Sequence, residues 1–225
     1  SRLAKLTTVN LVLNTCSEKY LKEVSGQSSI LVPNFIDEGF LIQEKKDINK
    51  EIKKAVFVGH VKSSKGVKEI IETAKHFSNI DFILAGPVSR EIELMETPEN
   101  VIFKGPVNQS VVKELLLTAD IFVFPTYSEG FSNALLEAMA NGVPIITTRV
   151  GANQDMIESF GGILVRTRNT DDIVQAILDL EDIGYRKRIS KWNINKVNNH
   201  YTINKVMSKL IQIYNMTCDD EAKDA

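Results

Sequence analysis

Apolar residues along most of the chain follow two alternating patterns, short continuous runs and longer stretches with helical spacing. The short runs read as strands, several end at glycine or proline, and they cover residues 55–58, 81–85, 101–103, 121–124, 144–147 and 162–165. The longer stretches repeat apolar residues at three- and four-residue intervals, as on one face of a helix, and cover residues 66–77, 109–118, 132–140 and 153–159. Apolar strands joined by helices are typical of a parallel sheet covered on both faces. We therefore predict a Rossmann-like α/β domain over roughly residues 52–180.

Both flanks of this domain differ from it. The carboxy-terminal flank is helical, with apolar stripes at residues 171–180, 185–197 and 204–216. The first fifty residues contain one strand–helix–strand pattern, followed by a charged segment at 43–54. Such a unit cannot bury both of its faces alone. We therefore predict that residues 1–36 end a preceding domain most of which is missing here, and an edge of the main domain is the alternative. The predicted organisation is this end at 1–36, a linker at 37–53, the main domain with its carboxy-terminal helices at 54–216, and a flexible tail at 217–225.

The composition adds limits to this picture. Of 225 residues, 43% are hydrophobic and 25% charged, which is the balance of an ordinary globular protein. The net charge of −2 gives no electrostatic reason to expect nucleic acid, so local groups must meet any phosphate. Cys16 and Cys218 are too far apart for a metal knuckle or a redox pair, and they fit a reducing cytosol. We find no signal peptide and no apolar run of the ~18–20 residues that a transmembrane helix needs. We expect a cytoplasmic protein. The alternative is that the full-length protein associates peripherally with the inner face of the membrane.

Ligands of an open parallel sheet bind at the carboxyl ends of its strands, so the loops there are the place to search. The loop after the first strand of the domain, residues 59–66, has neither the dinucleotide fingerprint nor the Walker pattern. In particular, Lys65 follows Ser64 rather than glycine and precedes Gly66 rather than serine or threonine. Hydride transfer and ATP hydrolysis therefore lose support.

The loop at residues 125–133 runs directly into a predicted helix. The first backbone N–H groups of a helix lack internal partners and favour an anion, and Gly130 has no side chain to obstruct a ligand. Glu129 and Glu137 are eight residues apart, which is about 12 Å at the ~1.5 Å rise of a helix. One carboxylate could hold sugar hydroxyls and the other ribose hydroxyls, with phosphates between them. Two solvent-facing glutamates are the alternative interpretation.

These residues resemble the signature of the family-four retaining glycosyltransferases. The resemblance covers about half the chain, in order and at the usual spacing, and rests on residues 57–59, 65–66, 105–107, 119–120, 124–140, 142–144, 150–152 and 161–165. It implies the carboxy-terminal, donor-binding half of a GT-B fold. It also implies transfer of a hexose from a UDP- or GDP-sugar to a glycan or lipid-linked acceptor, as in polysaccharide biosynthesis.

The resemblance further assigns roles to individual residues. Glu129 corresponds to the catalytic glutamate near the transferred sugar, Glu137 to the ribose-binding one and Lys65 to the lysine that pairs with the diphosphate. Val107 matches a position whose backbone contacts the base. Phe131, Ser132 and Asn133, which follow the donor-site residue Gly130, match the turn whose amides face the phosphates and the sugar.

One departure from the family pattern concerns the glycine at the end of the first strand, Gly59. The family usually has arginine next, and this chain has His60, whose ordinary pKa of ~6.5 gives no permanent charge. Lys62 could supply a second cation. We expect His76 and His200 to be structural.

No D-x-D motif lies in a suitable loop, so neither a metal nor another cofactor is expected. In the family, acceptor-binding groups lie on an amino-terminal domain, and residues 32–37 match its exit into the linker. The chain alone is therefore expected to bind donor weakly without transferring sugar. A non-catalytic nucleotide-sugar-binding module and another GT-B enzyme, such as a nucleotide-sugar 2-epimerase, are the alternatives.

Overall fold

The centre of the molecule is a six-stranded parallel sheet in the order β5–β4–β3–β6–β7–β8. The structure is a computed structural model, and it describes residues 9–41 and 47–221. The strands are β3 (Lys54–Val58), β4 (Asp81–Ala85), β5 (Val101–Gly105), β6 (Ile121–Phe124), β7 (Ile145–Thr148) and β8 (Gly162–Val165). Every residue of β6 and β7 is buried, which explains the continuous apolar runs. The strand order reverses between β3 and β6, so the sheet has its topological switch point there.

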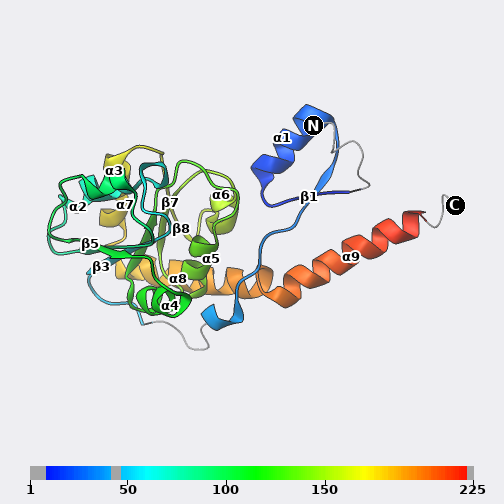
Figure 1. Cartoon of the computed structure of the whole chain (residues 1–225). Coiled ribbons are helices and arrows are strands. Elements are labelled where there is room, and N and C mark those ends of the chain that lie inside the picture. The colour runs from blue at the N-terminus through cyan, green and yellow to red at the C-terminus, as the bar shows by residue number, and fades with distance from the viewer. Residues whose placement is uncertain (1–8, 42–46, 222–225) are drawn as a thin grey trace.

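Helices cover both faces of this sheet (Figure 1). Helix α2 packs against α7 on one face, whereas α4 and α8 both pack against α5 on the other. Their bounds are α2 (Val67–Ala74), α3 (Arg90–Glu93), α4 (Gln109–Thr118), α5 (Asn133–Ala140), α6 (Asn153–Ile157), α7 (Thr170–Asp179) and α8 (Ile183–His200), with short 3-10 turns η2 (Glu38–Phe40) and η3 (Ser63–Lys65). The predicted α/β domain is therefore confirmed.

Side-chain caps set where several of these helices begin. Asn108, Ser132 and Asn169 each accept a hydrogen bond from the third backbone N–H of α4, α5 and α7, respectively. Helix α2 ends three residues before the predicted position, and α3 was not predicted because four residues are too few to show a helical period.

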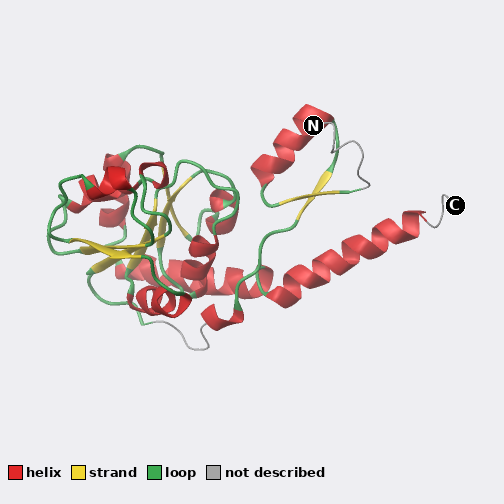
Figure 2. Cartoon of the chain, in the orientation of Figure 1, coloured by secondary structure: helices red, strands yellow, loops and turns green. Residues whose placement is uncertain are grey.

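The amino-terminal residues form a separate unit of two parallel strands and a helix. It comprises β1 (Asn10–Val12), α1 (Thr15–Ser25) and β2 (Ser29–Leu31), and its strands are not part of the large sheet. Helix α9 (Ile203–Glu221) projects away from the large sheet toward this unit (Figure 2). Val206 and Ile213 of α9 pack against Val32 just after β2. Helix α9 continues to Glu221, so the beginning of the predicted tail is helical, and residues 222–225 and 42–46 lie outside the described residues. That residues 1–36 end a preceding domain remains a prediction.

None of the described helices has the length and apolar composition that crossing a membrane requires.

Candidate functional site

The candidate site lies at the switch point, where two loops leave the carboxyl ends of β3 and β6. The first loop holds η3, whose last residue is Lys65, and the second runs from Pro125 to Ser132, immediately before α5. Adjacent parallel strands present their carboxyl ends at one edge, so residues 64 positions apart in sequence can meet there.

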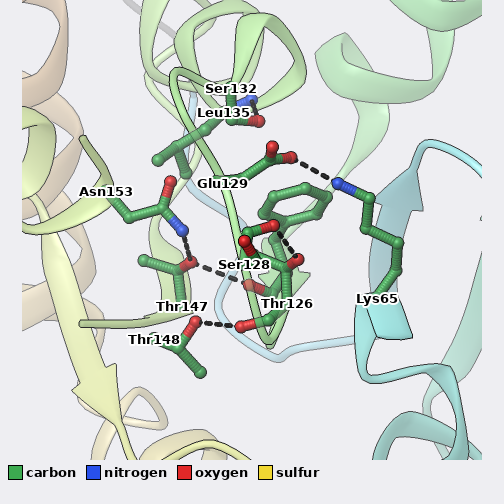
Figure 3. A network of polar contacts seen from close by, with 10 residues as sticks. Lys65, Thr126, Ser128, Glu129, Ser132, Leu135, Thr147, Thr148 and Asn153 are labelled. Carbon is green, nitrogen blue, oxygen red and sulfur yellow. Dashed lines mark hydrogen bonds and ion pairs between the residues drawn. The ribbon is translucent and has the colours of Figure 1, made fainter. Parts of the chain in front are cut away.

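Lys65 and Glu129 make a close ion pair across these loops. The Lys65 Nζ lies 2.6 Å from Glu129 Oε1, and the two side chains are only 21% and 18% exposed (Figure 3). The same ammonium lies 5.6 Å from the ring centroid of Phe124 at the end of β6. A partly desolvated ammonium of this kind is a strong donor to a phosphate oxygen, and a ligand that takes it releases the carboxylate to accept hydroxyl hydrogen bonds.

Buried hydroxyl groups of β7 hold the loop that carries Glu129. Thr147 Oγ1 donates to Phe124 O at 2.7 Å, and Thr148 Oγ1 donates to Thr126 O at 2.5 Å (Figure 3). Asn153 Nδ2 in turn donates to Thr147 Oγ1 at 3.0 Å. These bonds fix the loop backbone before any ligand arrives, which is the preorganisation that a binding site needs. Sequence reasoning missed both threonines, although two polar residues that end a buried apolar run were a signal for them.

Tyr127 connects the two loops to each other. Its backbone N–H donates to Ser64 O at 3.0 Å, and its hydroxyl donates to Glu69 Oε1 of α2 at 2.6 Å. Burial, followed by the Glu69 carboxylate, raises the pKa of Tyr127 to about 12, so the hydroxyl remains a donor. The Arg168 guanidinium lies 4.8 Å from the ring centroid. Sequence reasoning did not single out Tyr127, Glu69 or Arg168.

Two glycines allow the loop backbones to approach closely. At Gly66, φ is +74° and a Cβ would lie 2.2 Å from Pro125 O; at Gly151, φ is +50° and a Cβ would lie 1.7 Å from Glu129 O. A Cβ on Gly130, by contrast, would meet no atom within 4 Å. Packing within the protein therefore does not explain the glycine at position 130, and the expectation that it admits a ligand stays open.

The turn from Gly130 into α5 leaves backbone donors at the helix start without a partner among the described residues. Ser132 Oγ accepts from Leu135 N at 3.2 Å, so the cap satisfies only one N–H of the first turn. Phe131 packs edge-on against Tyr201, with ring centroids 6.0 Å apart. The Asn133 side chain is exposed and accepts from Asn34 Nδ2 at 3.1 Å.

Glu137 belongs to a different environment from Glu129. Burial, followed by the Asp37 carboxylate, raises the pKa of Glu137 to about 7, and a hydrogen bond with Gln109 opposes this effect. Helix α5 begins only at Asn133, so the first four of the eight residue steps from Glu129 belong to a loop. The helical estimate of 12 Å between the two glutamates therefore does not apply.

The remaining predicted residues lie in neighbouring loops. Gly59 and the exposed His60 directly follow β3, in the loop that carries Lys62 and Lys65. Val107 is half-buried in the loop after β5, two residues before the Gln109 that meets Glu137. Within residues 9–41 and 47–221, no group of three or more histidine, cysteine, aspartate or glutamate side chains could hold a metal ion.

The amino-terminal unit touches the same site from outside the large sheet. Asn14, which caps α1, donates through Nδ2 to Gly130 O at 2.8 Å and is almost fully buried. Next to it, Thr15 donates through its backbone N and Oγ1 to the two carboxylate oxygens of Asp155, at 2.8 and 2.7 Å. These contacts join α1 to the site loop and to α6, and sequence reasoning did not identify them.

The model of the family described as Glycosyl transferases group 1 matches residues 37–196, which include every candidate residue from Gly59 to Glu137. The chain is 28% identical over 171 residues to the capsular polysaccharide biosynthesis glycosyltransferase CapM of Staphylococcus aureus, covering 71% of this chain and 45% of that relative. It is 33% identical over 135 residues to N,N'-diacetylbacillosaminyl-diphospho-undecaprenol alpha-1,3-N-acetylgalactosaminyltransferase of Campylobacter jejuni, covering 56% of this chain and 35% of that relative.

Among solved structures, sucrose-phosphate synthase from Thermosynechococcus elongatus matches with a TM-score of 0.81 at 19% identity. The match covers 94% of this chain and 59% of that one. At this identity the likeness shows the fold alone. The chain spans about half the length of the first curated relatives that it matches.

Proposed function

Because the chain belongs to the group 1 family of glycosyl transferases, we propose that its six-stranded domain binds the nucleotide-sugar donor of a retaining transfer. The family and the GT-B fold that the sequence indicated are confirmed. The observation that carries the proposal is the Lys65–Glu129 ion pair at the switch point of the sheet, directly before the start of α5. The donor is a UDP- or GDP-hexose, and no metal takes part.

In this proposal Lys65 exchanges Glu129 for the donor diphosphate. As the bond between the anomeric carbon and the phosphate oxygen breaks, the leaving diphosphate takes the electron pair and gains negative charge. The oxygen of an acceptor hydroxyl bonds to the anomeric carbon, and the proton of that hydroxyl passes to the leaving diphosphate. The Lys65 ammonium, once released from Glu129, and the first N–H groups of α5 stabilise the negative charge. The released Glu129 carboxylate accepts hydrogen bonds from sugar hydroxyls and orients the sugar. His60 and Lys62, in the same loop as Lys65, add cations or donors at the phosphate.

Glu137 serves the nucleoside in this proposal. Its carboxyl group is poorly solvated and faces Asp37, so two ribose hydroxyls that donate to it would replace lost water contacts. The backbone at Val107 contacts the base in this proposal. Gln109, two residues further on, hydrogen-bonds Glu137, so the loop of Val107 lies near the proposed ribose site.

The transfer itself is proposed for the whole protein. Curated relatives carry names that include capsular polysaccharide biosynthesis and transfer to a diphospho-undecaprenol-linked sugar. We propose a glycan or lipid-linked acceptor and a cytoplasmic site of action, at the inner face of the membrane for a lipid-linked acceptor. Acceptor-binding groups are proposed to lie outside this chain, so the chain alone should bind donor without transferring sugar.

Calorimetry against UDP-, GDP- and ADP-sugars tests donor binding. We expect one nucleotide class to bind, and Lys65→Gln to weaken its binding about tenfold by removing one charge-assisted bond to phosphate. Lys68→Gln is the matched control, because Lys68 is an exposed lysine of α2 three positions away. Equal affinities for wild type and Lys65→Gln would contradict the proposal. Turnover by the full-length protein and its loss in Glu129→Ala separate an enzyme from a binding module.

A further inference from the structure

A concave feature lies next to Tyr201, whose ring packs against Phe131 of the candidate site. It is a groove of about 310 Å³ where α8 meets α9, and Leu31 and Pro33 at the end of β2 form its opposite wall. We call it the basic groove, and its polar lining includes Asp155, Lys196, His200, Tyr201, Lys205 and Lys209. His200 was expected from the sequence to be structural.

The basic side chains of this groove come in two helical pairs. Lys196 and His200 are four residues apart on α8, and Lys205 and Lys209 are four residues apart on α9. Side chains at this spacing lie on the same face of a helix, so each helix presents one pair to the groove. The groove thus gathers three lysines and His200 beside one aspartate, within a chain whose net charge is −2.

Two acidic groups lie at or beside the groove, Asp155 in its lining and Glu158 next to Lys196. Both carboxylate oxygens of Asp155 accept hydrogen bonds from Thr15, and Glu158 pairs with Lys196. No carboxylate of the described residues lies within ion-pair distance of Lys205 or Lys209. Two lysines in a concave surface without an acidic partner focus positive potential there.

The pKa of His200 is sensitive to that potential. Burial lowers the pKa of His200, and the charges of Lys196 on α8 and Lys205 on α9 lower it further, while Glu158 after α6 opposes them. An anion bound in the groove would reverse the effect of the two lysines and raise the pKa of His200.

We propose that the basic groove binds the phosphate group of an anionic ligand, held by Lys205 and Lys209 with Lys196 and His200 beside them. Ammonium groups bind phosphate as point charges and need no fixed fork geometry. Tyr201 lines the groove and packs against Phe131 of the candidate donor site, so the ligand would lie beside the site of transfer. The choice of ligand rests on the proposed function, because a lipid-linked acceptor carries its phosphate next to the sugar that is extended. The groove would hold that phosphate, while the groups that bind the acceptor's sugar lie outside this chain. The headgroup of an anionic membrane lipid presents the same chemistry.

Imidazole resonances of His200, titrated by NMR with inorganic pyrophosphate, provide the first test. We expect pyrophosphate to shift them and to raise the pKa of His200 in the wild-type protein. The double variant Lys205→Gln/Lys209→Gln should weaken the apparent affinity about tenfold. The control Lys187→Gln/Lys191→Gln removes an exposed pair at the same spacing on α8 and should leave the affinity unchanged. If the His200 resonances do not respond, or if both double variants bind pyrophosphate equally tightly, the proposal that the groove binds phosphate is wrong.

A third variant separates this proposal from donor binding. Lys65→Gln disables the candidate donor site and should leave the pyrophosphate response of His200 intact; its loss would place the anion at Lys65 instead. If the proposed function is wrong, wild type and Lys65→Gln will have equal affinities for nucleotide-sugars. The response of the His200 resonances to pyrophosphate would be unaffected by that result.

Vesicles distinguish the source of the phosphate. We compare sedimentation with phosphatidylcholine vesicles containing about 30% phosphatidylglycerol against pure phosphatidylcholine. Binding to the anionic vesicles that disappears in Lys205→Gln/Lys209→Gln supports a lipid headgroup. A pyrophosphate response without vesicle binding supports the diphosphate of an acceptor.

Discussion

The two glutamates of the candidate site lie in opposite electrostatic settings. At the Glu129 end, comprising Glu129, Lys65 and the loop 125–132, the carboxylate is neutralised by an ammonium 2.6 Å away. At the Glu137 end, comprising Glu137, Asp37 and Gln109, burial and a second carboxylate raise the pKa of Glu137 to about 7. The first end is a satisfied pair that a competing anion can open. The second is a poorly solvated carboxyl group, bonded to Gln109 and repelled by Asp37, that gains from hydroxyl donors.

The two ends also differ in how they are held. The loop of the Glu129 end is fixed by hydroxyl groups of β7, by Tyr127 and by the close approach of Gly151. Glu137 is carried by α5 itself, whose position is set by packing against α8. Variants that loosen the loop should therefore affect the Glu129 end first, and variants at Asp37 should affect only the Glu137 end.

The largest effect is expected from Gly151→Ala. Its Cβ would lie 1.7 Å from Glu129 O at a φ of +50°, so the loop backbone must move. We expect a loss of about 3 kcal/mol in the free energy of unfolding, measured by urea denaturation. Gly130→Ala is the control for stability, because its Cβ meets no atom within 4 Å; it should unfold like wild type while weakening donor binding. Equal stabilities of the two variants would show that the loop is not held as described.

Thr148→Val should have the next largest effect. The substitution keeps the shape of the side chain but leaves Thr126 O without the hydroxyl 2.5 Å away in a buried site. A loss of about 2 kcal/mol in the free energy of unfolding is expected. Weakened donor binding should accompany it if this bond positions Glu129. Thr118→Val, at an exposed threonine that ends α4, offers a comparison in which the hydroxyl bonds only its own helix.

Tyr127→Phe tests the link between the two loops with a smaller change. The variant keeps the ring and the backbone bond to Ser64 but removes the hydroxyl that donates to Glu69. We expect about 1 kcal/mol less stability by thermal unfolding, and a several-fold loss of donor affinity as Lys65 becomes less well positioned. Tyr20→Phe, on an exposed face of α1, serves as the control. Unchanged donor affinity at lower stability would make Tyr127 a purely structural residue.

The smallest effect, and one confined to the Glu137 end, is expected from Asp37→Asn. Removing that charge should lower the pKa of Glu137 from about 7 toward its ordinary value of 4.5 without reaching it, because burial is the larger cause. A carboxyl with a raised pKa binds its proton more tightly in the folded state, so its contribution to stability falls as pH rises from 4.5 to about 7. The decline should be shallower in Asp37→Asn and absent in Glu137→Gln, as measured by unfolding at pH 5 and pH 8. An unchanged carboxyl titration of Glu137 by NMR would contradict the coupling.

The sequence accounts for much of the fold because the central strands of the large sheet are buried and the helices that cover it have an apolar face. A strand that is buried on both faces appears as a continuous apolar run, as in residues 121–124. A helix that is buried on one face appears as apolar residues three or four positions apart, as in residues 109–118. The element that was not expected, α3, is too short to carry a period. The extension of α9 to Glu221 was missed because its acidic end lacks an apolar stripe.

The sequence by itself also pointed to the candidate site, because the position of Glu129 before a helix and after a buried strand is a local pattern. Only the tertiary structure decided its chemistry. Lys65 meets Glu129, Tyr127 meets Glu69, Asp37 meets Glu137 and Thr148 meets Thr126 through strand order and side-chain direction. Contacts of this kind depend on the relative placement of distant segments, and neither a hydrophobic period nor a motif encodes which charge will face which.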